Sequence, residues 1–138
     1  MDYELIFLVN TFSTLFLTGL IWFVQIVQYP SFYLVDEDSF IHFHAHHTKR
    51  ISFIVAPVMF LELISSAFLW HYSEWTSLPS IGFYIVLLIW MSTFFISVPK
   101  HNFLQQKKDP KVIHALVNTN WIRTCLWSIK AVLAFYLF

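Results

Sequence analysis

Residues 51–70 read ISFIVAPVMFLELISSAFLW, an apolar run in which Glu62 is the only charged residue. A helix needs about 20 mostly apolar residues to cross the hydrocarbon core of a bilayer. Three further runs have nearly the same character, at residues 5–28, 81–98 and 121–138. The sequence therefore predicts an all-α fold, an integral membrane four-helix bundle that forms a single domain over residues 1–138.

The composition of the whole chain supports this fold class. Hydrophobic residues make up 58% of the chain and charged residues only 12%, against about 25% charged residues in soluble domains. The formal net charge is zero, so no basic field indicates a nucleic-acid partner. The single cysteine, Cys125, excludes an intrachain disulfide and a CxxC redox or zinc motif. Membrane lipid is the expected partner of the chain, and the composition is also compatible with a homo-oligomer.

Lysine and arginine in the predicted connections indicate the orientation of the bundle. The first connection carries Lys49 and Arg50, and the third carries four lysines within residues 100–111. The second connection, at residues 71–80, has no lysine or arginine. Because positive charge accumulates in cytoplasmic loops, the first and third connections are expected in the cytoplasm. Both termini are then expected on the non-cytoplasmic side, in a bacterial inner membrane.

Six of the seven histidines lie in these two cytoplasmic connections, and four fall within HFHAHH at residues 42–47. Neutral imidazole is the commonest metal ligand in proteins. On a helix, residues 42 and 46 share one face, and residues 44 and 47 share another. We expect a transition-metal site, with iron favoured over copper or zinc. Its candidate ligands are His42, His44, His46, His47, His101 and His114.

Other interpretations of the histidines remain open. Haem b is an alternative cofactor, in which His47 and His101 from different helices would be the cofactor-binding axial ligands. A cluster that responds to pH is a second alternative. A polar interfacial loop without chemistry is the third.

Two charges lie near the middle of the predicted spans. Glu62 belongs to the second span and Lys130 to the fourth, at similar depth because these spans run in the same direction. A lone charge there costs about 2.5–3.5 kcal/mol. The two are expected to meet in the bundle interior as an intramembrane charge pair, the alternative being separate polar partners.

Polar residues also form stripes on two of the predicted helices, and such stripes turn away from lipid. The simplest packing faces the two stripes together and gives a polar interior that widens toward the cytoplasmic histidines. Purely structural contacts between the helices would produce the same stripes and remain the alternative. The first stripe contains Asn10, Thr14, Thr18, Gln25 and Gln28, and the second contains Asn120, Arg123, Trp127 and Lys130.

The C-terminal third, VPKHNFLQQKKDPKVIHALVNTNWIRTCLW at residues 98–127, resembles a family of small four-helix membrane proteins that includes fungal anthrone oxygenases. The residues that carry the resemblance are Pro99, Asn102, Leu104, Asn120, Trp121 and Arg123, with Gly19 and the pair Tyr29-Pro30 in the first helix. The resemblance spans the whole chain, and its C-terminal motif is the more specific part. It implies a four-helix membrane fold and an oxygenase activity.

These observations favour a membrane oxidoreductase or oxygenase that acts on a lipophilic small molecule, aromatic or polyene, near the cytoplasmic leaflet. Histidines would hold the metal, while Asn102, Asn120 and Arg123 would be the catalytic residues that orient or polarise the substrate. One alternative is a proton-coupled transporter or channel that uses Glu62 and Lys130. The other is a non-catalytic subunit of a membrane protein assembly.

Overall fold

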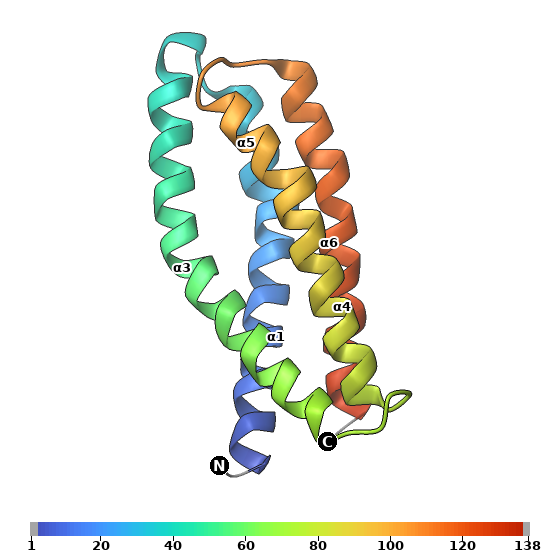
Figure 1. The fold of residues 1–138 in the computed structure, drawn as a ribbon. Helices are drawn as coiled ribbons and strands as arrows, with labels where there is room; N and C mark the ends of the chain where they lie inside the picture. Colours follow the sequence, from blue (N-terminus) through green and yellow to red (C-terminus); the bar gives the residue numbers. More distant parts are fainter. Residues whose placement is uncertain (1–2, 137–138) are drawn as a thin grey trace.

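The computed structural model describes residues 3–136 and shows four long helical rods joined by short connections (Figure 1). The first rod consists of α1 (Tyr3–Phe23), the π-helical η1 (Val24–Gln28), α2 (Tyr29–Ser31) and the 3-10 helix η2 (Phe32–Leu34). The second is α3 (Glu37–His71). The third consists of α4 (Leu78–Ser92), the π-helical η3 (Thr93–Ser97) and α5 (Val98–Leu104), and the fourth is α6 (Pro110–Tyr136). No strand occurs among the described residues, so the predicted all-α architecture is confirmed.

The rods pack side by side into one bundle. α1 packs against α3 and α6, and α4 packs against the same two helices. The start of α1 and the end of α6 lie at the same end of the bundle as the connection between α3 and α4 (Figure 1). The opposite end carries the start of α3 and the end of α5 (Figure 1). That opposite end is called the histidine end below, because HFHAHH lies there.

Three rods are long and apolar enough to cross a membrane, at Tyr3–Leu34, Glu37–His71 and Leu78–Leu104. The fourth rod, α6, has 27 residues, which exceeds the length a span needs. It is more polar because it carries buried Arg123 and Lys130. The last two residues of the predicted span 121–138, like residues 1 and 2, lie outside the described part of the chain.

Two of the predicted connections are largely helical, so the helices extend beyond the predicted spans. α3 begins at Glu37, although the sequence suggested a span only from residue 51. Glu37 and Asp38 occupy its first turn, where acidic side chains interact favourably with the helix dipole. Phe40 and His44 are fully buried, so tertiary packing stabilises this polar segment as helix. α6 likewise begins at Pro110, which leaves residues 105–109 as its connection to α5.

Each of the two π-helical segments ends two residues before a proline, at Pro30 and Pro99. A proline ring inside a helix clashes with the carbonyl group four residues earlier. Those carbonyls belong to Ile26 and Phe95, which lie inside η1 and η3. The wider π turn accommodates the proline without ending the rod, and such turns are frequent at functional sites. Both π turns lie shortly before residues of the site described next.

Candidate functional site

Glu62 and Lys130 form an ion pair in the middle of the bundle. Lys130 Nζ lies 2.9 Å from Glu62 Oε1, and both residues are buried. Thr14 bridges them, because its hydroxyl donates to Glu62 Oε1 at 2.9 Å and accepts from Lys130 Nζ at 2.6 Å. Trp127 Nε1 donates to the second carboxylate oxygen at 3.1 Å. Every charged atom of the pair therefore has a polar partner, which is the condition for tolerating buried charge.

Asn10 extends this cluster along α1. Its amide nitrogen donates to the hydroxyls of Ser65 and Ser66 at 2.9 and 2.7 Å, and its oxygen lies 3.4 Å from Lys130 Nζ. The polar stripes on α1 and α6 thus turn toward each other, as predicted, and they also contact α3. The cluster holds three helices together through charged and polar contacts.

A second polar cluster lies nearer the histidine end and connects all four rods. Arg123 Nη2 donates to the Tyr29 hydroxyl at 3.2 Å, and that hydroxyl lies 2.9 Å from His101 Nε2. His101 Nδ1 lies 3.1 Å from His44 Nε2. The two imidazole rings are stacked, with centroids 5.2 Å apart. These four side chains form a continuous hydrogen-bonded chain from α6 to α3.

Under one choice of the two histidine tautomers, in which the Tyr29 hydroxyl is a donor, all hydrogen bonds of this chain point the same way. The Tyr29 oxygen accepts from Arg123, so its own hydrogen is directed to His101 Nε2. His101 then carries its proton on Nδ1 and donates to His44 Nε2. His44 carries its proton on Nδ1, which is buried and has no partner within residues 3–136. With these tautomers the hydrogens point from Arg123 toward His44.

Asn120 and Gln25 hold Arg123 in place. Asn120 is fully buried, accepts a short hydrogen bond from Arg123 Nη2, and donates to Gln25 Oε1 at 2.8 Å. Gln25 Nε2 in turn donates to the backbone oxygen of Val117 at 3.2 Å. Asn120 does not line the cavity described below. It is thus placed to position Arg123, whereas a catalytic role had been expected for it.

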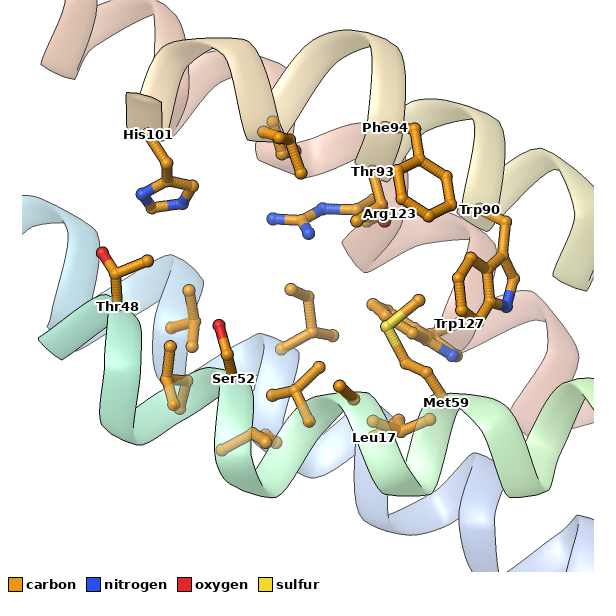
Figure 2. A pocket seen from close by; sticks show the side chains of 18 of the residues that line it. Leu17, Thr48, Ser52, Met59, Trp90, Thr93, Phe94, His101, Arg123 and Trp127 are labelled. Atoms are coloured by element: carbon orange, nitrogen blue, oxygen red, sulfur yellow. The ribbon is translucent and has the colours of Figure 1, made fainter. Parts of the chain in front are cut away.

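A cavity of about 550 Å³ lies between α3 and the third rod, with α1 and α6 behind it. His101 and Thr48 lie at one end, and Met59, Trp90 and Trp127 lie at the other (Figure 2). The guanidinium group of Arg123 points into the cavity from α6 (Figure 2). Most of the wall is apolar, with a few polar groups near the histidine end, which is the usual make-up of a small-molecule site.

The six histidines proposed as metal ligands do not gather at one point. His44 is fully buried and contacts His101, and the His47 ring packs on Phe32 at 5.3 Å. The other three, His42, His46 and His114, are exposed. Among residues 3–136 no three His, Cys, Asp or Glu side chains are grouped so that they could hold a metal ion. The full predicted ligand set therefore does not fit a single metal.

The metal prediction can be tested at His44 and His101, the two histidines that contact each other. Any iron, copper or zinc held here would depend on His44 and His101, because their ring nitrogens alone approach each other within 3.1 Å. Metal found in purified untagged protein should therefore disappear in His44→Leu and remain in the exposed control His42→Leu. Elemental analysis and a visible spectrum measure this. A Soret band would indicate haem b, and its loss on replacing His101 would identify His101 as a ligand. Metal retained in both leucine variants would contradict this assignment.

Of the three residues expected to act on substrate, Asn102 and Arg123 line the cavity. Tyr29 was missed as a site residue, although it also lines the cavity and contacts both Arg123 and His101. The signal that would have found it is its position next to Pro30, since the site residue His101 also lies close to a proline, two residues after Pro99. Both prolines mark distorted turns at the same end of the bundle.

Searches against protein-family models, curated proteins and solved structures give no match for this chain. The resemblance to the family that includes fungal anthrone oxygenases therefore stays a prediction.

Proposed function

We propose that this chain is a membrane-embedded oxidoreductase that binds a lipophilic small molecule in the cavity between α3 and the third rod. The observation that carries the proposal is the convergence of Arg123, Tyr29 and His101 at one end of an otherwise apolar cavity. Apolar walls select a lipophilic substrate, and the few polar groups fix its orientation.

The hydrogen-bonded chain would remove a proton from the bound substrate. When Tyr29 accepts that proton, its own hydrogen passes to His101 Nε2, and the hydrogen on His101 Nδ1 passes to His44. Tyr29 and His101 end neutral, and His44 becomes the imidazolium. Arg123 would stabilise negative charge that develops on a substrate oxygen, in a site that excludes most water. Dioxygen is the oxidant in this proposal.

The proposal includes α6 as a fourth membrane span. Within residues 121–136 of α6 the charged side chains are Arg123 and Lys130, and both face the bundle interior, where each has polar partners. Its exposed face is apolar and suits contact with lipid, with Ile122, Ile129, Val132 and Phe135 exposed. The four lysines within residues 100–111 support a cytoplasmic location of the histidine end.

This orientation predicts opposite labelling of two engineered cysteines. In a Cys125→Ser background, Ser77→Cys lies in the connection between α3 and α4, and Gln106→Cys lies in the connection between α5 and α6. An impermeant thiol reagent applied to intact bacterial cells should label the cysteine at 77 and not the one at 106. The reverse pattern would invert the orientation.

Filling the cavity should abolish turnover. Ala56 lines the cavity on α3, whereas Ile54 lies outside it and is exposed. We expect Ala56→Trp to remove oxidation of a lipophilic probe, because the indole would occupy the space that the probe needs. Ile54→Trp is the matched control and should retain activity. The assay follows dioxygen uptake by protein in lipid nanodiscs, with anthrone as the aromatic probe and linoleate as the polyene probe.

The products of this assay are checked by mass balance. Anthrone and one dioxygen give anthraquinone and one water, and linoleate and one dioxygen give the hydroperoxide. Formation of either product above the rate of protein-free nanodiscs, with loss in Ala56→Trp only, would support the proposal. Equal rates in Ala56→Trp and Ile54→Trp would contradict it, as would no protein-dependent product.

A further inference from the structure

The cavity is a long groove rather than a round pocket. On α3 its lining runs from Thr48 to Phe60, and on the third rod it runs from Trp90 to Asn102. Both stripes repeat every three or four residues, so each is one face of its helix. A rise of about 1.5 Å per residue gives the groove a length of about 18 Å. It runs along the helices, which is along the bilayer normal if they span the membrane.

The mouth of the groove faces outward between these two rods. Lining residues of both rods are themselves exposed, namely Ser52, Ala56 and Phe60 on α3, and Phe94, Val98 and Asn102 on the third rod. Exposed apolar residues surround the bundle at this level, including Phe53 and Phe95. The groove is therefore open to the region that lipid chains would occupy, and a lipid-soluble ligand can enter it sideways.

The polarity of the groove changes along its length. His101 and Thr48 lie at the histidine end, Arg123 points into the space next to them, and Met59 and Trp90 close the far end (Figure 2). A ligand that matches this pattern has a polar head toward Arg123 and His101 and an apolar chain toward Trp90. Such a ligand is an amphiphile with a single chain, because the groove runs between one pair of facing helices.

Arg123 indicates the charge of the head group. It is only 7% exposed, and its partners are the neutral Tyr29 hydroxyl and the neutral Asn120 amide oxygen. Its buried Nε has no hydrogen-bond partner in the described part of the chain, and no carboxylate there forms an ion pair with it. A buried cation without a counterion is unfavourable, so an anion in the groove would supply the missing partner.

We propose that the groove binds a long-chain carboxylate, with its head group on Arg123 and its chain directed toward Met59 and Trp90. A carboxylate carries one negative charge and balances one guanidinium group. A phosphate carries about 1.5 to 2 negative charges at neutral pH, which would leave an excess in this buried place. This inference rests on the proposed function, since it assigns the substrate class to the same cavity.

Tryptophan fluorescence tests the inference by equilibrium binding, without turnover. Trp90 and Trp127 line the far end of the groove, so a bromine in mid-chain of bound dibromostearate should quench them. In phosphatidylcholine nanodiscs, we expect saturable quenching that unlabelled stearate reverses. The corresponding brominated alcohol should bind at least tenfold more weakly, because it cannot form a charge-assisted hydrogen bond with Arg123. Apparent affinities are corrected for partitioning into protein-free nanodiscs.

Arginine variants identify the residue that recognises the carboxylate. Arg123→Gln should bind the acid and the alcohol equally, and Arg123→Lys should recover part of the preference. Arg50→Gln is the matched control, because Arg50 is exposed and outside the groove. Circular dichroism and gel filtration verify that each variant is folded. If Arg123→Gln does not fold, the comparison of Arg123→Lys with the wild-type protein still reports the preference.

The outcomes separate this inference from the proposed function. Equal affinity for stearate and the alcohol in the wild-type protein would overturn the carboxylate assignment and leave an oxidase of neutral lipophiles intact. Tighter binding of lysophosphatidate than of stearate would also overturn it. Absence of saturable quenching would overturn binding in the groove altogether. Stearate binding that depends on Arg123, in a protein that oxidises neither anthrone nor linoleate, would support this inference while contradicting the proposed function.

Discussion

Replacing Glu62 by glutamine is expected to destabilise the protein by about 3–5 kcal/mol, because it leaves the Lys130 ammonium buried without its counterion. Lys130 lies 2.9 Å from Glu62 and is only 3% exposed. Its remaining partners, Thr14 and Asn10, are neutral. Neither can balance the charge, so the loss should approach the upper part of this range. The quantity to measure is the free energy of unfolding in mixed detergent micelles.

The double-mutant cycle with Lys130→Met isolates the interaction between the two side chains. The double variant Glu62→Gln, Lys130→Met should be more stable than the less stable single variant, since no unpaired charge remains. Glu74→Gln serves as the control, because Glu74 is exposed and its substitution should change stability by less than about 0.5 kcal/mol. Single effects that add to the double effect would show that the pair does not stabilise the bundle.

The sequence alone placed this pair well, for a simple physical reason. Charged side chains in a predicted span must avoid hydrocarbon, and Glu62 and Lys130 occupy similar positions along two predicted spans that run in the same direction. The polar stripes followed from the same argument, and the structure buries Asn120, Arg123, Trp127 and Lys130 on one face of α6. Depth and helical period are both properties of the sequence, so features that depend on them could be predicted.

The histidine cluster was predicted less completely. Helical spacing correctly separated the exposed pair, His42 and His46, from the more buried pair, His44 and His47. It gave no indication of which face would be buried, because hydropathy suggested that the helix began only at residue 51. The meeting of His44 with His101 depends on how α3 packs against α5, and packing between distant segments is not encoded in spacing. The cavity could not be predicted from the sequence either, because it arises from the space between two packed rods.

The π turns explain why Tyr29 was missed. Each proline forces a wider turn, and a wider turn changes the angle at which all later side chains leave the helix. A regular helical period carried through Val24–Gln28 therefore misplaces Tyr29 relative to Gln25. The same applies to His101 after Thr93–Ser97. A sequence pattern that assumes 3.6 residues per turn fails at the two points where the site is built.

Tyr29→Phe is expected to lower the turnover number about 10²- to 10⁴-fold, the usual contribution of general acid–base catalysis. The change removes only the hydroxyl that links Arg123 to His101, at 3.2 and 2.9 Å. Arg123 keeps its hydrogen bond to Asn120, so the affinity for the substrate should change much less than kcat. Tyr33→Phe is the matched control, because Tyr33 is 41% exposed and does not line the cavity.

Two further measurements distinguish a proton chain from a merely structural contact. His101→Gln interrupts the same chain at its next member, so the double variant Tyr29→Phe, His101→Gln should be no slower than the slower single variant. In the wild-type protein the rate should fall toward acidic pH, because a protonated His101 cannot accept the hydrogen of Tyr29. That acidic limb should be absent from the residual activity of His101→Gln and present in the exposed control His114→Gln. Additive losses, or an unchanged acidic limb in His101→Gln, would show that proton transfer does not pass through this chain.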